Sequence, residues 1–271
     1  MMKSQEKVMK AISLHALWMK GDPKGKEAVF RGQDLAGIDL QGVNLRGVNF
    51  VDANLAGANF SRSDLSRANL SGADLTGAIF ESTKALRAEF NDAILDDAKI
   101  QKGNFLDSRF NRASFVKAHI EGVDFKKSSF EEANFHKVRL TKVNLANAHL
   151  HAANLSKAIV VSSRFVGAVI SNTDCRGAFF RESDFRAADL RGADMTAAIT
   201  IGANLQKSNL QRANLKNAKF LSANLVGARY GVREFRNVFS LEDSTVSKNM
   251  LAFININPRA SGFSNTLTVV G

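Results

Sequence analysis

The sequence predicts an all-β solenoid, in which the chain winds into stacked coils, and two observations lead to this prediction. A large apolar residue recurs at nearly every fifth position from about Gln33 to Tyr230, with a small residue two positions before it. This period of five fits neither the 3.6-residue period of a helix nor the two-residue period of a strand. A short extended segment followed by a turn, repeated along the chain, satisfies the pattern.

Each five-residue unit reads small, polar, large, turn, turn, as in residues 73–77 (Ala-Asp-Leu-Thr-Gly). Side chains alternate sides in an extended segment, so the small and large residues point inward and the polar residue points outward. Glycine and polar residues at the last two positions suit a turn. The only prolines, Pro23 and Pro258, lie outside the repeat, as expected if each coil needs its N–H groups to bond its neighbours.

This unit resembles the consensus of the pentapeptide-repeat family, A-(D/N)-L-x-x, over about 200 of the 271 residues. The resemblance implies a right-handed quadrilateral parallel β-helix, with four units per coil and about ten coils. At a strand spacing of about 4.8 Å, the rod would be roughly 48 Å long. Because one fold hosts several functions, the resemblance alone says little about activity.

The repeat divides the chain into three predicted parts. Residues 1–32 form an N-terminal helix and turn that cap the solenoid, residues 33–230 form the β-helix, and residues 231–271 form a C-terminal cap or partner-binding tail of strands and loops. Within the tail, residues 251–256 and 266–270 have the composition of strands. Solenoids need such caps, because each coil is covered mainly by its neighbours.

The N-terminal helix is predicted from a stripe of apolar residues. Val8, Ile12, His15 and Trp18 lie near one face of a helix spanning residues 4–20. We expect Trp18 and the neighbouring leucines to cover the open end of the rod. No stretch is long and apolar enough for a membrane span, and no secretory signal is evident. The sequence therefore predicts a cytoplasmic protein, or a virion-associated one if a phage encodes it.

The formal charge of +11 is unevenly distributed. Residues 1–32 carry a net charge of +4, residues 33–100 carry −4, residues 101–230 carry +10, and the remaining tail carries +1. The rod is therefore mildly acidic at first and basic later. A basic surface is suited to anionic partners.

No pattern in the sequence indicates catalysis. The single cysteine, Cys175, occupies an inward slot, and the aspartates occupy the outward polar slot, where the family resemblance implies a structural role. His149 and His151 flank an inward leucine, but no third ligand for a metal accompanies them. No phosphate-binding loop, dinucleotide fingerprint or nucleophile elbow is present. We predict a non-enzymatic protein without a cofactor, a metal site or a small-molecule substrate.

Residues twenty apart should stack on one side of a four-sided coil, so the sequence can be read in columns. One outward column contains bulky apolar residues where Asp or Asn would be ordinary, and its neighbour on the same strands is also apolar. The predicted protein interface comprises Ile159, Val161, Phe179, Ile199, Ile201 and Leu221. An exposed apolar patch of this kind indicates contact with another surface. Either the C-terminal tail covers it, or a partner or second subunit does.

Two sets of basic residues are candidates for anion binding. One set forms an outward column, and the other set should ring a single coil. The candidates are Lys117, Lys137 and Lys157 in the column, and Arg176, Arg181, Arg186 and Arg191 in the ring. Nucleic acid or another polyanion could bind them, although no aromatic residues accompany them for base stacking. A solvated basic surface is the alternative.

Three functions are compatible with these observations. The first is a rigid scaffold that docks other protein chains, or copies of itself, through its faces and tail, for instance in a phage particle. The second is imitation of DNA, as in pentapeptide-repeat proteins that protect DNA gyrase; those rods are strongly acidic, whereas residues 101–230 are basic here. The third is a polyanion-binding rod or a host-directed effector.

Overall fold

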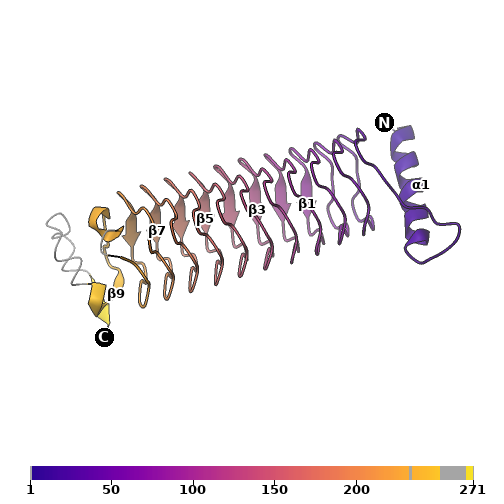
Figure 1. Cartoon of the computed structure of the whole chain (residues 1–271). Coiled ribbons are helices and arrows are strands. Elements are labelled where there is room, and N and C mark those ends of the chain that lie inside the picture. Colours follow the sequence, from indigo (N-terminus) through magenta and orange to yellow (C-terminus); the bar gives the residue numbers. More distant parts are fainter. Residues whose placement is uncertain (1, 232–233, 251–266, 271) are drawn as a thin grey trace.

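The computed structural model describes residues 2–231, 234–250 and 267–270, which form an elongated rod (Figure 1). From Val29 to Arg229 the chain returns to the same side every twenty residues, and parallel bridges join each coil to the next. Four such columns of bridges run along the rod, which has about nine turns, close to the ten that the repeat predicts. The predicted four-sided parallel β-helix is therefore confirmed.

One side of the rod is a sheet of eight short parallel strands, each paired with the strand twenty residues later. In every strand the middle residue points into the core and the two flanking residues point outward. The strands are β1 (Ile79–Glu81), β2 (Lys99–Gln101), β3 (His119–Glu121), β4 (Arg139–Thr141), β5 (Ile159–Val161), β6 (Phe179–Arg181), β7 (Ile199–Ile201) and β8 (Lys219–Leu221).

The other three sides consist of single bridges separated by tight turns. In a representative turn, the N–H of Ala93 donates to the carbonyl of Phe90 at 3.1 Å, and Asp92 between them has a φ of 59°. A positive φ at the third residue is the geometry of a type II turn. The outward Asp or Asn supports the turn, since Asn59 Oδ1 accepts a hydrogen bond from the N–H of Ser61 at 3.0 Å. The polar slot of the repeat is thus a turn-stabilising position.

The core is a column of large side chains interleaved with small ones. Phe110 stacks on Phe90 and on Phe130, with ring centroids 4.7 and 4.9 Å apart. Where serine replaces alanine in the small slot, its hydroxyl is satisfied inside the coil: Ser128 Oγ donates to the Phe105 carbonyl at 2.7 Å and accepts from the N–H of Ser108 at 3.1 Å. Buried polar groups of this kind must be paired to be tolerated.

Helix α1 (Met2–Trp18) lies across the first coil and covers it with Val8 and Ile12, which are buried (Figure 1). His15 is also buried: its Nδ1 accepts a hydrogen bond from the N–H of Ala28 at 3.1 Å, so the proton is on Nε2, which donates to the carbonyl of Arg46 at 2.8 Å. The expectation that Trp18 covers the end of the rod is wrong. Trp18 is 44% exposed and stacks on the outer side of His15, because the helix ends there and the chain turns back.

The repeat loses its register at the C-terminal end. Ser240 bridges Lys219, which precedes it by 21 residues instead of twenty. A short 3₁₀ helix, η1 (Glu234–Asn237), precedes this point, and β9 (Thr245–Ser247) follows it. The predicted strand at residues 266–270 is confirmed in its described part as β10 (Thr268–Val270), which pairs with β9. The predicted strand at 251–256 lies outside the described residues, and β9 was not predicted.

Candidate binding surfaces

Strands β5 to β8 carry the apolar residues predicted from the column reading. Ile159, Phe179 and Ile199 are paired in register across β5, β6 and β7, so their side chains stack outward in one row. Val161, Ile201 and Leu221 lie in the second outward row. We call these six residues the apolar face. All six are partly buried, not fully exposed as expected, because stacked side chains in adjacent strands cover one another.

Phe239 extends the apolar face beyond β8, and the column reading missed it. The N–H of Phe239 donates to the carbonyl of Ala218, just as the N–H of Lys219 donates to the carbonyl of Ala198, so Phe239 occupies the next position in the row. Its ring is 59% exposed and lies 4.8 Å from Lys219 Nζ. Phe239 follows Lys219 by twenty residues and so continues the column, but the column was read only as far as Lys219, near the end of the repeat.

The described part of the tail lies beside the apolar face. Strand β9 continues the column of Asn204 and Asn224, which belongs to the neighbouring side of the rod, and β10 pairs with β9 there. The prediction that the tail covers the apolar face, as the alternative to a partner or second subunit, falls partly on residues 251–266, which lie outside the described residues.

The predicted ring of arginines does not consist of free cations. Arg176, Arg186 and Arg191 each form an ion pair with the aspartate two residues earlier, at 2.6 to 2.7 Å, and Arg181 pairs with Glu182 at 3.1 Å. The hydrogen bond from Arg176 holds the pKa of Asp174 below its usual value, so this aspartate stays ionised. These four arginines are neutralised by their neighbours and are poor candidates for anion binding. The lysine column (Lys117, Lys137, Lys157) is exposed and without ion pairs among the described residues, and its role stays a prediction.

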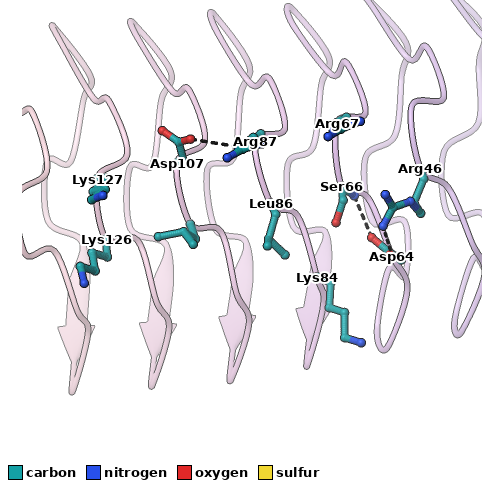
Figure 2. Close-up of a pocket in the computed structure, with 11 residues that line it drawn as sticks. Arg46, Asp64, Ser66, Arg67, Lys84, Leu86, Arg87, Asp107, Lys126 and Lys127 are labelled. Carbon is teal, nitrogen blue, oxygen red and sulfur yellow. Dashed lines mark hydrogen bonds and ion pairs between the residues drawn. The ribbon is translucent and has the colours of Figure 1, made fainter.

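A basic groove that was not predicted from the sequence lies on the side of the rod next to the sheet, along the column that contains Asp64 and Lys84 (Figure 2). It has a volume of about 550 Å³ and extends over successive coils of the first half of the β-helix. Its lining residues are Arg46, Asp64, Ser66, Arg67, Lys84, Leu86, Arg87, Leu106, Asp107, Lys126 and Lys127. Six of these side chains are basic and two are acidic, so the lining has an excess of positive charge.

Both acidic residues of the basic groove are engaged by arginines. Asp64 lies 3.5 Å from Arg46, and Asp107 lies 3.1 Å from Arg87. Partial burial favours the neutral form of Asp64, but hydrogen bonds from Ser66 and the nearby Arg46 outweigh this effect and lower its pKa. Two arginines of the groove are therefore locally neutralised.

Four cations of the basic groove have no ion pair within the described part of the chain: Arg67, Lys84, Lys126 and Lys127. They surround an apolar centre made by Leu86 and Leu106, which are partly buried. Figure 2 shows Leu86 between Arg87 on one side and Lys84 on the other. The groove thus combines an apolar floor with basic edges.

The sequence reading missed the basic groove because it followed one slot of the repeat at a time. Lys84 occupies the outward slot, Leu86 the first turn position and Arg87 the second, and successive coils contribute side chains from these same three slots. The local excess of basic residues would have been visible from a comparison of adjacent columns within the same few coils. The negative net charge of residues 33–100 hides this excess.

The described residues include a single cysteine and several potential metal ligands. Cys175 is buried, and its burial, together with Asp174 and Asp194, raises the pKa of the thiol. In the part of the chain that the structure describes, no three His, Cys, Asp or Glu side chains could hold a metal ion together. In that same part, no helix has the length and apolar character needed to cross a membrane.

Comparison with known proteins agrees with the geometry of the coils. The family model for pentapeptide repeats matches eight copies, within residues 26–62, 44–81, 88–126, 128–165, 163–199 and 201–229. No curated protein matched the sequence.

Among solved structures, HetL, a pentapeptide-repeat protein involved in heterocyst differentiation regulation from the cyanobacterium Nostoc sp. strain PCC 7120, is 19% identical, with a TM-score of 0.45 over 83% of this chain and 94% of HetL. Full-length QnrB1, a plasmid-mediated fluoroquinolone resistance protein, is 15% identical, with a TM-score of 0.30 over 84% of this chain and 95% of QnrB1. Since the family model covers most of residues 26–229, the chain belongs to the pentapeptide-repeat family.

Proposed function

We propose that this chain is a non-catalytic, rigid rod that docks another protein chain, either a different protein or a second copy, through the apolar face. The observation that carries the proposal is the row of Ile159, Phe179 and Ile199 on the outward side of the sheet. Phe239 lies in the same row beyond Lys219, whose ammonium lies over its ring. Apolar residues in this row replace the Asp or Asn that supports the turn in other coils. Contiguous apolar patches on a surface mark interaction sites, and aromatic anchors carry much of the binding energy of such sites.

The rigidity of the rod supports the same proposal. The backbone of each coil is bonded to the coils before and after it, and the interior is filled by stacked rings and aliphatic side chains. A surface on such a scaffold has little conformational freedom to lose when a partner binds, which lowers the cost of association. Imitation of DNA is not proposed, because its acidic surface is absent from the basic second half of the rod.

The proposal is tested by returning the apolar face to the repeat consensus. In a triple variant, Ile159→Asn, Phe179→Asp and Ile199→Asn introduce residue types that occupy this slot in many other coils, so the fold should persist. We expect loss of partner binding, or of self-association, measured by crosslinking, affinity purification from the native source with mass spectrometry, and analytical ultracentrifugation.

The matched control is Ile94→Asn, which changes an isoleucine of the same slot on another side of the rod, where it is 43% exposed. The control should bind as the wild type does. If the triple variant retains the same bound chain as the wild type and the control, the apolar face is not the docking site.

A further inference from the structure

We infer that the basic groove is a second binding site, for an extended acidic segment of a protein that carries an apolar side chain. This site lies on a different side of the rod from the apolar face and in earlier coils, and the inference does not depend on the function of that face. The charge of the groove, its apolar centre and its length each indicate this ligand.

The charge of the basic groove selects an anionic ligand. Arg67, Lys84, Lys126 and Lys127 are exposed and lack ion pairs within the described residues, whereas the carboxylates of Asp64 and Asp107 are engaged by arginines. Unpaired cations collected on one side of a rod attract acidic partners and speed their association. The net charge of the whole chain is +11, so a long-range attraction acts in the same direction.

The apolar centre distinguishes between anionic ligands. Leu86 and Leu106 are adjacent in the coil stack and form a floor between the basic edges. Phosphodiester chains present no apolar group that could use such a floor, and the lining has no aromatic side chain on which a base could stack. An acidic peptide with a leucine or a similar side chain satisfies both the floor and the edges.

The dimensions agree with a peptide. Arg67 and Lys127 are three coils apart, which corresponds to about 14 Å at the spacing of neighbouring strands. An extended chain rises about 3.3 Å per residue, so roughly four to five ligand residues span this distance. The recognised element is therefore short: one or two apolar side chains between acidic ones.

The inference is tested with fluorescence-labelled synthetic probes of about twelve residues. The first probe is a glutamate-rich peptide with two central leucines, the second has serines in place of these leucines, and the third is an oligothymidine of similar length. We expect the leucine peptide to bind more tightly than the serine peptide. Binding should weaken as salt is raised, because the contacting charges are exposed.

Two groove variants make the expectation specific. The double variant Arg67→Glu with Lys127→Glu should lower the affinity for the leucine peptide about tenfold or more, since the new glutamates repel the acidic residues of the peptide. Leu86→Ser with Leu106→Ser should weaken it about fivefold to tenfold through loss of apolar contact. Both sets are compatible with the fold, because Glu132 occupies the same turn position as Arg67 with a φ of 58°, and Ser66 occupies the position of Leu86 one coil earlier.

Matched controls lie elsewhere on the rod. The double variant Lys117→Glu with Lys137→Glu reverses two charges at the same turn position on another side of the rod. Val166→Ser removes a partly buried apolar residue from the column of Leu86 and Leu106, three coils beyond Leu106. Both controls should bind the leucine peptide within about twofold of the wild type. The triple variant of the apolar face should also bind it unchanged, which separates this site from the proposed docking function.

Three results would overturn the inference. Tighter binding of oligothymidine that is indifferent to the leucine substitutions would identify a nucleic-acid surface. Equal affinity for the leucine and serine peptides would reduce the groove to a general polyanion surface. Absence of binding by all probes at low salt would leave only a solvated basic surface.

Discussion

Single residues at the corners of the rod carry both the turn geometry and much of the surface charge. An aspartate in the outward slot accepts a hydrogen bond from the N–H two residues later, where the turn begins. In the later coils the arginine at that position also binds the same carboxylate with its side chain: Arg186 on Asp184 and Arg191 on Asp189. One carboxylate thus stabilises a turn and neutralises a cation. This local pairing is why a row of arginines in the sequence did not produce a row of free charges.

These pairs predict a pH dependence of stability. The hydrogen bond from Arg191 lowers the pKa of Asp189 in the folded state; burial opposes the same effect at Asp184, but the bonds from Arg186 outweigh it. An aspartate whose pKa is lowered in the folded state stabilises the fold at pH values above its unfolded pKa, near 3.8. This contribution is lost as the pH falls through its pKa in the folded state. A triple variant with Arg176→Gln, Arg186→Gln and Arg191→Gln should therefore have a lower urea midpoint than the wild type at neutral pH, and the two midpoints should converge as the pH falls below 3.8.

The control for this pH dependence is a variant with Lys117→Gln, Lys137→Gln and Lys157→Gln, which removes three lysines without ion pairs among the described residues. Its midpoint should differ from that of the wild type by a similar amount at all pH values between about 3 and 7. An arginine variant whose loss of stability persists unchanged at low pH would show that the pairs do not stabilise the fold through ionised aspartates.

Among the elements, helix α1 closes the N-terminal end of the β-helix. His15 satisfies two backbone groups of different coils, the N–H of Ala28 and the carbonyl of Arg46, inside a buried contact. Val8 and Ile12 supply the apolar cover of the first coil. The helix is therefore held to the rod by hydrogen bonds as well as by apolar packing.

Replacing His15 should release this end of the rod. His15→Phe keeps an aromatic ring but leaves the two backbone groups unpaired, at a cost of about 1–3 kcal/mol for each group that stays buried. We expect a lower free energy of unfolding in denaturant titrations and faster hydrogen exchange at the amide of Ala28. Ser13→Ala, on the exposed side of the helix, is the control. Equal stability of the two variants would show that His15 does not hold the helix in place.

The elements also show how far the sequence could predict this structure. A strict period of five requires one large inward residue per unit, which dictates the coils, their register and the positions of the apolar face. The exposed Trp18 could not be predicted, because it depends on where the chain leaves a regular element. Phe239 lies in the twenty-residue column but beyond Tyr230, where the five-residue pattern no longer supports the count. The basic groove was missed for another reason: its residues come from three slots of the repeat and meet only across stacked coils.

Over the whole molecule, stability is a sum of contacts between neighbouring coils. Every internal coil has two neighbours, and the interior phenylalanines stack from one coil to the next, as Phe115 does on Phe135 at 4.8 Å. The first coil is covered by α1, and the last coil by β9 and by Phe235, which is buried against the end of the core. Each terminal coil thus depends on a cover that is not part of the repeat.

This arrangement predicts a gradient of hydrogen exchange along the rod. Amides of the central coils, for instance at residues 90–150, should be the most protected, and protection should decrease toward residues 29–50 and toward β9, because local opening at an end breaks only one set of contacts between coils. Mass spectrometry after proteolysis at several exchange times measures this profile. Uniform exchange along the rod would indicate that all coils open together, in contrast to the expected fraying from the ends.

Because of the twenty-residue register, the number of residues between two surfaces determines their separation along the rod and their orientation around it. Inserting or deleting twenty residues between the basic groove and the apolar face would change their axial separation by one step of about 4.8 Å and keep their relative orientation. Inserting five residues would instead turn every later surface by one side of the square. The number of repeats between the two surfaces therefore sets both the distance and the angle between two bound partners, while the chemistry of each surface stays the same.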